Sequence, residues 1–210
     1  MPITGQGWEF HVQRLGLHRR GERVRTYGSY EVFINNVSAA ANNPLLKGNV
    51  CEVIGPGKNH PEGNGLRIEQ GRYQLTTQFG KYVSIGFSDS TTIAAKVHMP
   101  AVALIGTGER TAILIHPGHP REEGGVPPTS YISSVGCFNL TQPLTAQDSI
   151  NFFESRLRVI ALINSLTAFA PAAFHNAQGK PIKSNTTIPR AFAIVDGESM
   201  NDISAAPLVS

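Results

Sequence analysis

The stretch Trp8-Glu9-Phe10-His11-Val12-Gln13-Arg14-Leu15 alternates apolar and polar side chains. Because successive side chains of a β-strand point to opposite faces, this pattern predicts a half-buried strand. Similar runs follow, separated by Gly, Pro and Asn, at residues 23–27, 30–34, 50–54, 72–77 and 82–87. The first half of the chain is therefore expected to form a β-rich core.

Two further apolar runs, 101–105 and 111–115, flank Gly106-Thr107-Gly108-Glu109. This arrangement predicts two neighbouring strands joined by a tight turn. The segment 117–129 is rich in Gly and Pro. Long loops without regular structure are often binding or lid elements in compact domains, so we expect a functional loop here.

After Thr145, the spacing between apolar residues changes from that of a strand to that of a helix. Thr145 and Asp148 have the spacing of a helix N-terminus, and apolar residues then recur at three- and four-residue steps. The pattern predicts an amphipathic helix of about twenty residues that ends before Pro171. The fold class is thus mainly β (α+β), with a catalytic-type domain over residues 1–169 and a C-terminal extension over residues 170–210.

Composition excludes several classes of protein. Hydrophobic residues make up 40% of the 210 residues and charged residues 16%, which is typical of a turn-rich globular chain. The net charge is +3, and its one basic cluster (Arg19, Arg20, Arg23 and Arg25) is too small for a nucleic-acid interface. The chain shows neither a signal peptide nor a membrane span. We therefore expect it in the cytoplasm of the cell that makes it.

The residues that carry chemistry are Cys137 and His116. His116 ends an apolar run directly before the 117–129 loop, and Cys137 follows Gly136. A thiol is mostly protonated at neutral pH, so a neighbouring imidazole is needed to accept its proton. Gly136 lets the backbone approach a substrate carbonyl, and amides near Gly136 and Cys137 suit an oxyanion. The other cysteine, Cys51, is expected to be a buried strand residue.

The neighbours of these two residues resemble a family signature. His116 is followed by seventeen residues and then by Ser134-Val135-Gly136-Cys137-Phe138-Asn139. The L,D-transpeptidases, which cut and rejoin peptides of the bacterial cell wall, have a His, fourteen to seventeen residues, Ser or Thr, and His-Gly-Cys. Gly71-Arg72-Tyr73 is similar to the family's strand entry. The resemblance covers roughly residues 66–140 and extends to an uncharacterised domain of bacteria and phages.

This resemblance implies a β-sandwich or barrel with one helix after the cysteine, and cofactor-free acyl transfer or hydrolysis on peptidoglycan stem peptides. It implies Cys137 as nucleophile, His116 as base, and the Pro117 carbonyl as the group that orients the base. We expect Ser134, Asn139, His119, Tyr131 and Tyr73 to bind substrate. A leaderless chain of this kind would act in the periplasm, as a phage enzyme or as an exported antibacterial toxin with a secretion apparatus or an immunity protein as partner.

Two alternatives stay open. The family has His before Gly-Cys where this chain has Val135, so a non-catalytic wall-binding or assembly protein could keep the same fold. A metal hydrolase could use His116 and His119 together with Glu122, Glu123 or Cys137. Pro117 and Pro120 argue against the helical His pair that such sites commonly use.

Overall fold

The computed structural model describes residues 5–63, 65–87, 99–119, 129–131 and 135–197. Strands account for 42% of the structure and helices for 16%, with one α-helix among the described residues. The prediction of a mainly β fold with a single helix is therefore confirmed.

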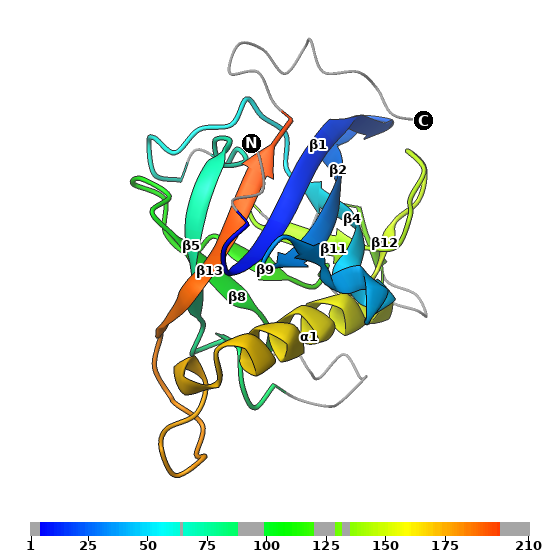
Figure 1. The fold of residues 1–210 in the computed structure, drawn as a ribbon. Helices are drawn as coiled ribbons and strands as arrows, with labels where there is room; N and C mark the ends of the chain where they lie inside the picture. Colours follow the sequence, from blue (N-terminus) through cyan, green and yellow to red (C-terminus); the bar gives the residue numbers. More distant parts are fainter. Residues whose placement is uncertain (1–4, 64, 88–98, 120–128, 132–134, 198–210) are drawn as a thin grey trace.

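Eight strands form a closed barrel (Figure 1). Their bounds are β1 Trp8–Arg20, β2 Arg23–Ile34, β4 Lys47–Glu52, β5 Gly71–Thr77, β8 Val102–Ile105, β9 Leu114–His116, β11 Phe138–Thr141 and β13 Thr187–Asp196. The order around the barrel is β1-β13-β5-β8-β9-β11-β4-β2, and β2 pairs back with β1. Closure leaves none of these eight strands with an unpaired edge.

Short elements surround the barrel. They are β3 Val37–Ser38, β6 Tyr82–Val83, β7 Met99–Pro100, β10 Thr129–Ser130, β12 Ile150–Asn151, and the 3-10 turns η1 Ala39–Ala41, η2 Pro44–Leu46 and η4 Pro171–Ala173. The run predicted as a strand over 82–87 is thus a strand only in β6. The predicted pairing of the two apolar runs around Gly106 is confirmed, because β8 and β9 are antiparallel neighbours. The predicted tight turn between them was wrong, because β9 begins only at Leu114 and residues 106–113 form the connection.

Strand β2 joins two runs that the sequence predicts as separate strands. Gly28 lies in the middle of β2, opposite a bulge in β1 between Arg14 and Gly16. A Cβ at Gly28 would lie only 2.6 Å from the Gln13 carbonyl oxygen. The glycine therefore allows a close approach of two backbones here and does not mark a turn.

Alternation along the strands divides the side chains between two faces. Ile115 of β9 and Phe138 of β11 lie in the main core inside the barrel. Leu114 lies in a separate cluster with Ala101 and Ala103, and Cys137 packs against that cluster. Because adjacent residues point to opposite faces, this second cluster is on the outer face of the barrel wall.

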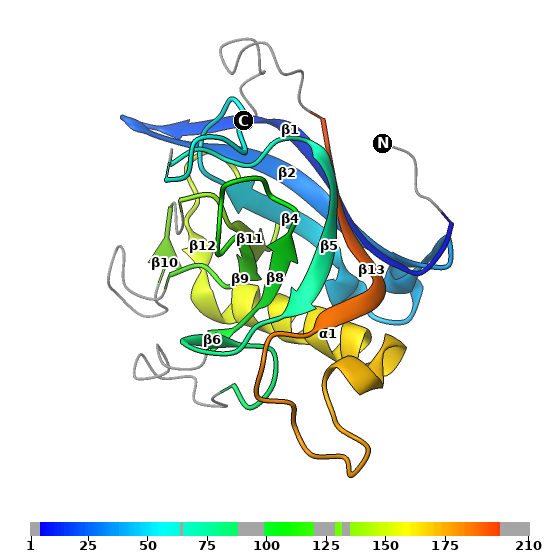
Figure 2. The same cartoon turned by 90° about the vertical axis from the view of Figure 1, so that its left-hand side faces the viewer.

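Helix α1, Phe152–Phe169, lies across one end of the barrel (Figures 1 and 2). Its residues Val159, Leu162 and Leu166 belong to the main core, and Ser165 accepts a 3.0 Å hydrogen bond from Trp8 Nε1. Within the described residues, this helix does not have the length and apolarity that a membrane crossing requires.

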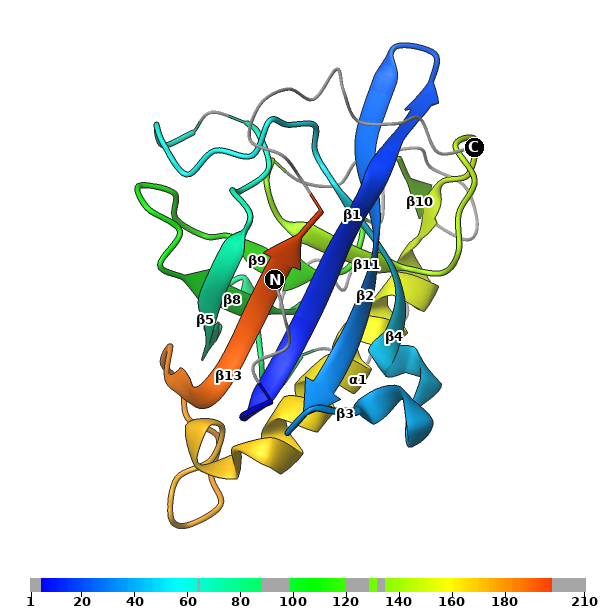
Figure 3. The ribbon, with the colours of Figure 1, turned by 45° about the horizontal axis from the view of Figure 1, so that its top comes forward.

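The segment expected to be a C-terminal extension supplies a barrel strand. β13 lies between β1, to which it is parallel, and β5, to which it is antiparallel (Figure 3). Its residues Ala191, Ala193 and Val195 are fully buried in the main core. The chain after residue 170 therefore completes the barrel.

Candidate active site

His116 is the last residue of β9, the position that the sequence predicts. Its side chain is buried, and Nδ1 lies 2.7 Å from the carbonyl oxygen of Pro117. Since a carbonyl only accepts hydrogen bonds, Nδ1 carries the proton and donates it to this bond. The neutral ring then presents Nε2 as the basic nitrogen.

Asn139 braces the same segment from the neighbouring strand. β9 and β11 are parallel, with Asn139 paired to His116. The Asn139 amide nitrogen donates to the carbonyl oxygens of His116 at 3.1 Å and Pro117 at 3.4 Å. The Asn139 side chain is 1% exposed and holds the backbone of His116 and Pro117 in place.

The Cys137 thiol is half-buried and lies directly before β11. Leu114 N–H donates to Sγ at 3.3 Å, and the thiol donates to the Ala112 carbonyl oxygen at 3.5 Å. Ala112 has a φ of 55°, a left-handed conformation that L-residues rarely adopt. Strained backbone thus directs a carbonyl at the thiol.

Cys137 and His116 lie on the same outer face of neighbouring strands. β11 and β9 pair with Phe138 opposite Ile115, and both of these side chains point inward. The flanking Cys137 and His116 therefore point outward. Tyr82 of β6 packs against the same cluster as Cys137, and its ring centroid lies 5.0 Å from that of His116.

Both groups are uncharged at neutral pH. Burial lowers the pKa of His116 to about 4, a shift that the Pro117 hydrogen bond opposes and the nearby His119 favours. Burial raises the pKa of the Cys137 thiol to about 11, which the Leu114 hydrogen bond and the charge of Arg110 oppose. The resting site therefore has a protonated thiol and a neutral imidazole on the same barrel face, and not an ion pair.

Sequence reasoning missed two residues of this site, Tyr82 and Arg110. Arg110 is buried, and its Nη2 donates to the Val135 carbonyl oxygen at 2.8 Å. It precedes β9 by four positions, in a segment that reads as an ordinary turn. The one signal that could have singled it out is an arginine directly before an apolar run that ends in the candidate base.

Gly136 lies against Arg110. Its φ of 133° is in the region that glycine favours, and a Cβ there would lie 2.1 Å from Arg110 Nη2. Val135 is 74% exposed. Glycine at position 136 therefore leaves room for the Arg110 guanidinium.

Two tyrosines expected to bind substrate have structural contacts. Tyr131 is fully buried between Arg20 and Arg25, whose guanidinium carbons lie 4.3 and 4.2 Å from its ring centre, and it donates to the Ala146 carbonyl oxygen. Two of the four arginines in the basic cluster therefore pack against this one ring. Tyr73 lies in the main core and donates to the Glu69 carbonyl oxygen at 2.7 Å.

The sequence also predicts His119 and Ser134 as substrate-binding residues. His119 is half-buried and close enough to His116 to lower its pKa. Ser134 lies outside the described residues, as do Glu122 and Glu123, which the metal alternative invokes. In the described part of the chain, no three His, Cys, Asp or Glu side chains lie together as metal ligands would.

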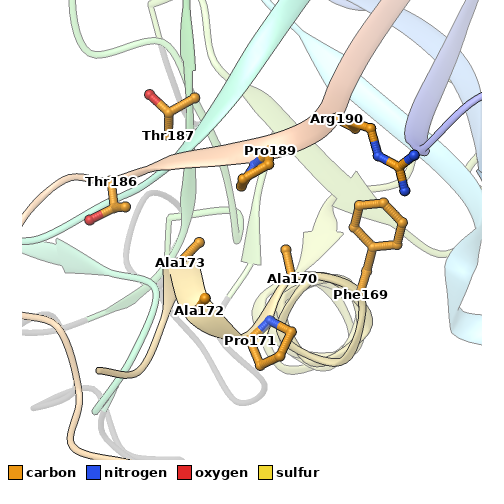
Figure 4. Close-up of a pocket in the computed structure, with 9 residues that line it drawn as sticks. All are labelled: Phe169, Ala170, Pro171, Ala172, Ala173, Thr186, Thr187, Pro189 and Arg190. Atoms are coloured by element: carbon orange, nitrogen blue, oxygen red, sulfur yellow. The ribbon is translucent and has the colours of Figure 1, made fainter. Parts of the chain in front are cut away.

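A separate cavity of about 350 Å³ lies at the end of α1 (Figure 4). Its lining comes from α1, η4 and β13 and consists of Phe169, Ala170, Pro171, Ala172, Ala173, Thr186, Thr187, Pro189 and Arg190. These residues include no Cys, His, Asp or Glu, so the cavity offers no nucleophile paired with a base. The face around Cys137 is the stronger candidate for chemistry.

No family model, curated protein or solved structure matches this chain.

Proposed function

We propose that this protein is a cysteine-dependent acyl transferase or hydrolase that acts on the stem peptides of peptidoglycan. The observation that carries the proposal is the His116 ring, held through Nδ1 by the Pro117 carbonyl on the same barrel face as Cys137. An imidazole fixed in this tautomer is oriented as a general base. The motif around Cys137 supports the choice of substrate.

The reaction follows from these groups. The thiol proton passes to Nε2 of His116 as Sγ attacks an amide carbonyl carbon and the C–S bond forms. Collapse of the tetrahedral intermediate breaks the C–N bond, and the leaving amine takes the proton from His116. Water or a second amine then releases the acyl group from Cys137. Water gives carboxypeptidase or endopeptidase activity, and an amine gives transpeptidation.

The place of action follows from the substrate. Peptidoglycan lies outside the cytoplasmic membrane, so the proposal places the enzyme in the periplasm, after export as an antibacterial effector or after release at lysis. The mild positive charge of the chain suits an anionic wall polymer.

The test uses purified wall fragments that carry tetrapeptide and pentapeptide stems, with the products identified by mass. We expect the unmodified chain and Cys51→Ala to shorten or exchange the stems, and Cys137→Ala and His116→Ala to do neither. Cys51→Ala is the matched control, since Cys51 is the other thiol and pairs with Asn139 through β4. Absence of product from the unmodified chain, or activity that survives Cys137→Ala, would refute the proposal.

The second candidate is a wall-binding or assembly protein that uses this face without turnover. The protonation states favour it, because a thiol pKa of about 11 leaves only about one thiol in ten thousand ionised at pH 7. Iodoacetamide labelling, resolved by peptide mass, separates the candidates. A catalytic Cys137 labels much faster than Cys51 below pH 8, whereas equally slow labelling of both thiols favours binding without turnover.

A further inference from the structure

Arg110 connects three segments that surround the candidate nucleophile. Its Nη1 donates to the carbonyl oxygens of Lys58, at 3.2 Å, and Leu66, and its Nη2 donates to that of Val135 at 2.8 Å. The side chain is 6% exposed, so these carbonyls replace the water that would otherwise solvate the guanidinium. A buried cation is thereby fixed directly behind the turn that precedes Cys137.

The Gly136 backbone lies directly against the Arg110 guanidinium. A Cβ at Gly136 would lie 2.1 Å from Arg110 Nη2 and 3.1 Å from the Leu66 carbonyl oxygen. A side chain would push the guanidinium away from the backbone next to the thiol. The glycine of the Gly-Cys pair therefore brings a positive charge close to Cys137.

Several other ionisable groups face this region. Tyr82 of β6 packs against the same outer cluster as Cys137, with its ring centroid 5.0 Å from that of His116, and the Glu52 carboxylate of β4 raises the pKa of the thiol. Glu52 forms a bidentate ion pair with Arg14, at 2.8 Å for each contact. Arg110 is the cation whose charge opposes the effect of burial on Cys137.

We propose that Arg110 is a positioning residue that stabilises the Cys137 thiolate, through a guanidinium charge held against Gly136 by the Val135 and Leu66 carbonyls. The proposal rests on the proposed role of Cys137 as nucleophile. In that role, Arg110 counters the negative charge on sulfur as the proton moves to His116. It acts through Cys137 and does not contact substrate.

The test measures alkylation of Cys137 by iodoacetamide, which is neutral, and by iodoacetate, which is anionic, between pH 7 and 9. Arg110→Gln removes the charge, and Arg110→Lys keeps it. Arg158→Gln is the matched control, because Arg158 also donates to a carbonyl, that of Lys47, and also lies against a glycine, Gly48. Peptide-resolved mass spectrometry separates Cys137 from Cys51, and thermal melts monitor folding.

We expect Arg110→Gln to move the plot of log rate against pH by about one to two pH units toward high pH, as loss of one nearby charge predicts. The ratio of iodoacetate to iodoacetamide rates should fall severalfold in Arg110→Gln and stay near the original value in Arg110→Lys and Arg158→Gln. A merely structural role would not change this ratio, since both reagents need the same access to sulfur.

An unchanged profile and ratio in Arg110→Gln would overturn the proposal. So would faster labelling, which would mean that Arg110 only shields the thiol. If Arg110→Gln does not fold, a lowered ratio in Arg110→Lys contradicts the proposal and a retained ratio supports it. The labelling rates do not depend on turnover, so a failure of the wall-fragment assay is distinguishable from a failure of this inference.

Discussion

At the scale of single residues, burial determines the protonation of the site. The same low-dielectric surroundings lower the pKa of His116 to about 4 and raise that of Cys137 to about 11, because burial disfavours the charged form of each group. The proposed reaction therefore requires proton transfer at the moment of attack, from a thiol that Leu114 N–H and Arg110 make more acidic. For this proton transfer, the position of the His116 ring relative to the thiol matters more than the basicity of the ring.

Asn139 is predicted to control that position. Asn139→Ala removes the bonds to the His116 and Pro117 carbonyls, and should lower the free energy of unfolding by about 1–3 kcal/mol. It should also lower turnover of wall fragments on the order of a hundredfold, because small displacements of a catalytic group are costly. Urea unfolding and the product assay measure the two effects.

Asn49→Ala is the control for this change. Asn49 lies on β4 and donates to the Gly28 carbonyl oxygen at 3.2 Å, away from the base. Its loss should cost about 1 kcal/mol of stability and leave turnover intact. Equal effects of both variants on turnover would mean that Asn139 acts only on stability.

At the scale of elements, the start of α1 shows that a sequence pattern typical of a helix start can instead form a separate turn. The Thr145 amide and hydroxyl both donate to Asp148 Oδ2 at 2.8 Å, but they close an isolated turn. Ile150 then pairs with Ser130 through β12 and β10, so the chain stays extended up to Asn151. The helix begins at Phe152, seven positions after Thr145, and the predicted start was wrong.

Asn151 is therefore predicted to be the stabilising N-cap. Its side-chain oxygen accepts from the amides of Phe153 at 3.0 Å and Glu154 at 3.2 Å. Asn151→Ala should lower the free energy of unfolding by about 1 kcal/mol, whereas Asn151→Ser should retain most of it. Thr145→Ala should cost less, since Thr145 is exposed. A larger loss from Thr145→Ala in urea unfolding would reverse this assignment.

At the scale of the whole molecule, the fold buries two histidines in uncharged form. His18 stacks on Tyr27 with ring centroids 4.1 Å apart, and its Nδ1 lies 3.0 Å from Arg25 Nη2. Burial, and then the charge of Arg25, lowers the pKa of His18 to about 4, as burial does for His116. Both side chains are less than 5% exposed.

These histidines predict a loss of stability in acid. An unfolded His titrates near 6.5, so between pH 6.5 and 4 the unfolded chain binds protons that the folded chain does not. The free energy of unfolding should therefore fall as pH falls through this window, by up to about 3 kcal/mol for each histidine. Above pH 6.5 the contribution is fully present.

Urea unfolding at pH 7, 6 and 5 measures this slope. His18→Gln and His116→Gln should each flatten it, and His175→Gln, at a half-exposed position outside the barrel strands, should leave it unchanged. A slope that neither of the first two variants reduces would show that other groups cause the acid sensitivity.

The sequence by itself determined the features that depend on near neighbours. Alternation predicted β1 and β5, because side chains of a strand change face at every residue, and a continuous apolar run predicted β8. The apolar run before His116 placed that residue correctly at the end of a strand, and the motif at Cys137 placed the thiol directly before β11. The helix end before Pro171 follows from the backbone amide that proline lacks.

Only the tertiary structure decided which distant segments meet. Residues 191–195 look strand-like in the sequence, but only the structure shows that β13 pairs with β1 and β5 in the barrel. Pairing between β9 and β11 places Asn139 next to His116, and the tertiary fold places the Arg110 guanidinium against Gly136. Tyr131 and Tyr73 look like site residues in the sequence, but they are buried by contacts with segments far along the chain. Such contacts depend on strand pairing across the whole barrel, and local sequence carries no record of that pairing.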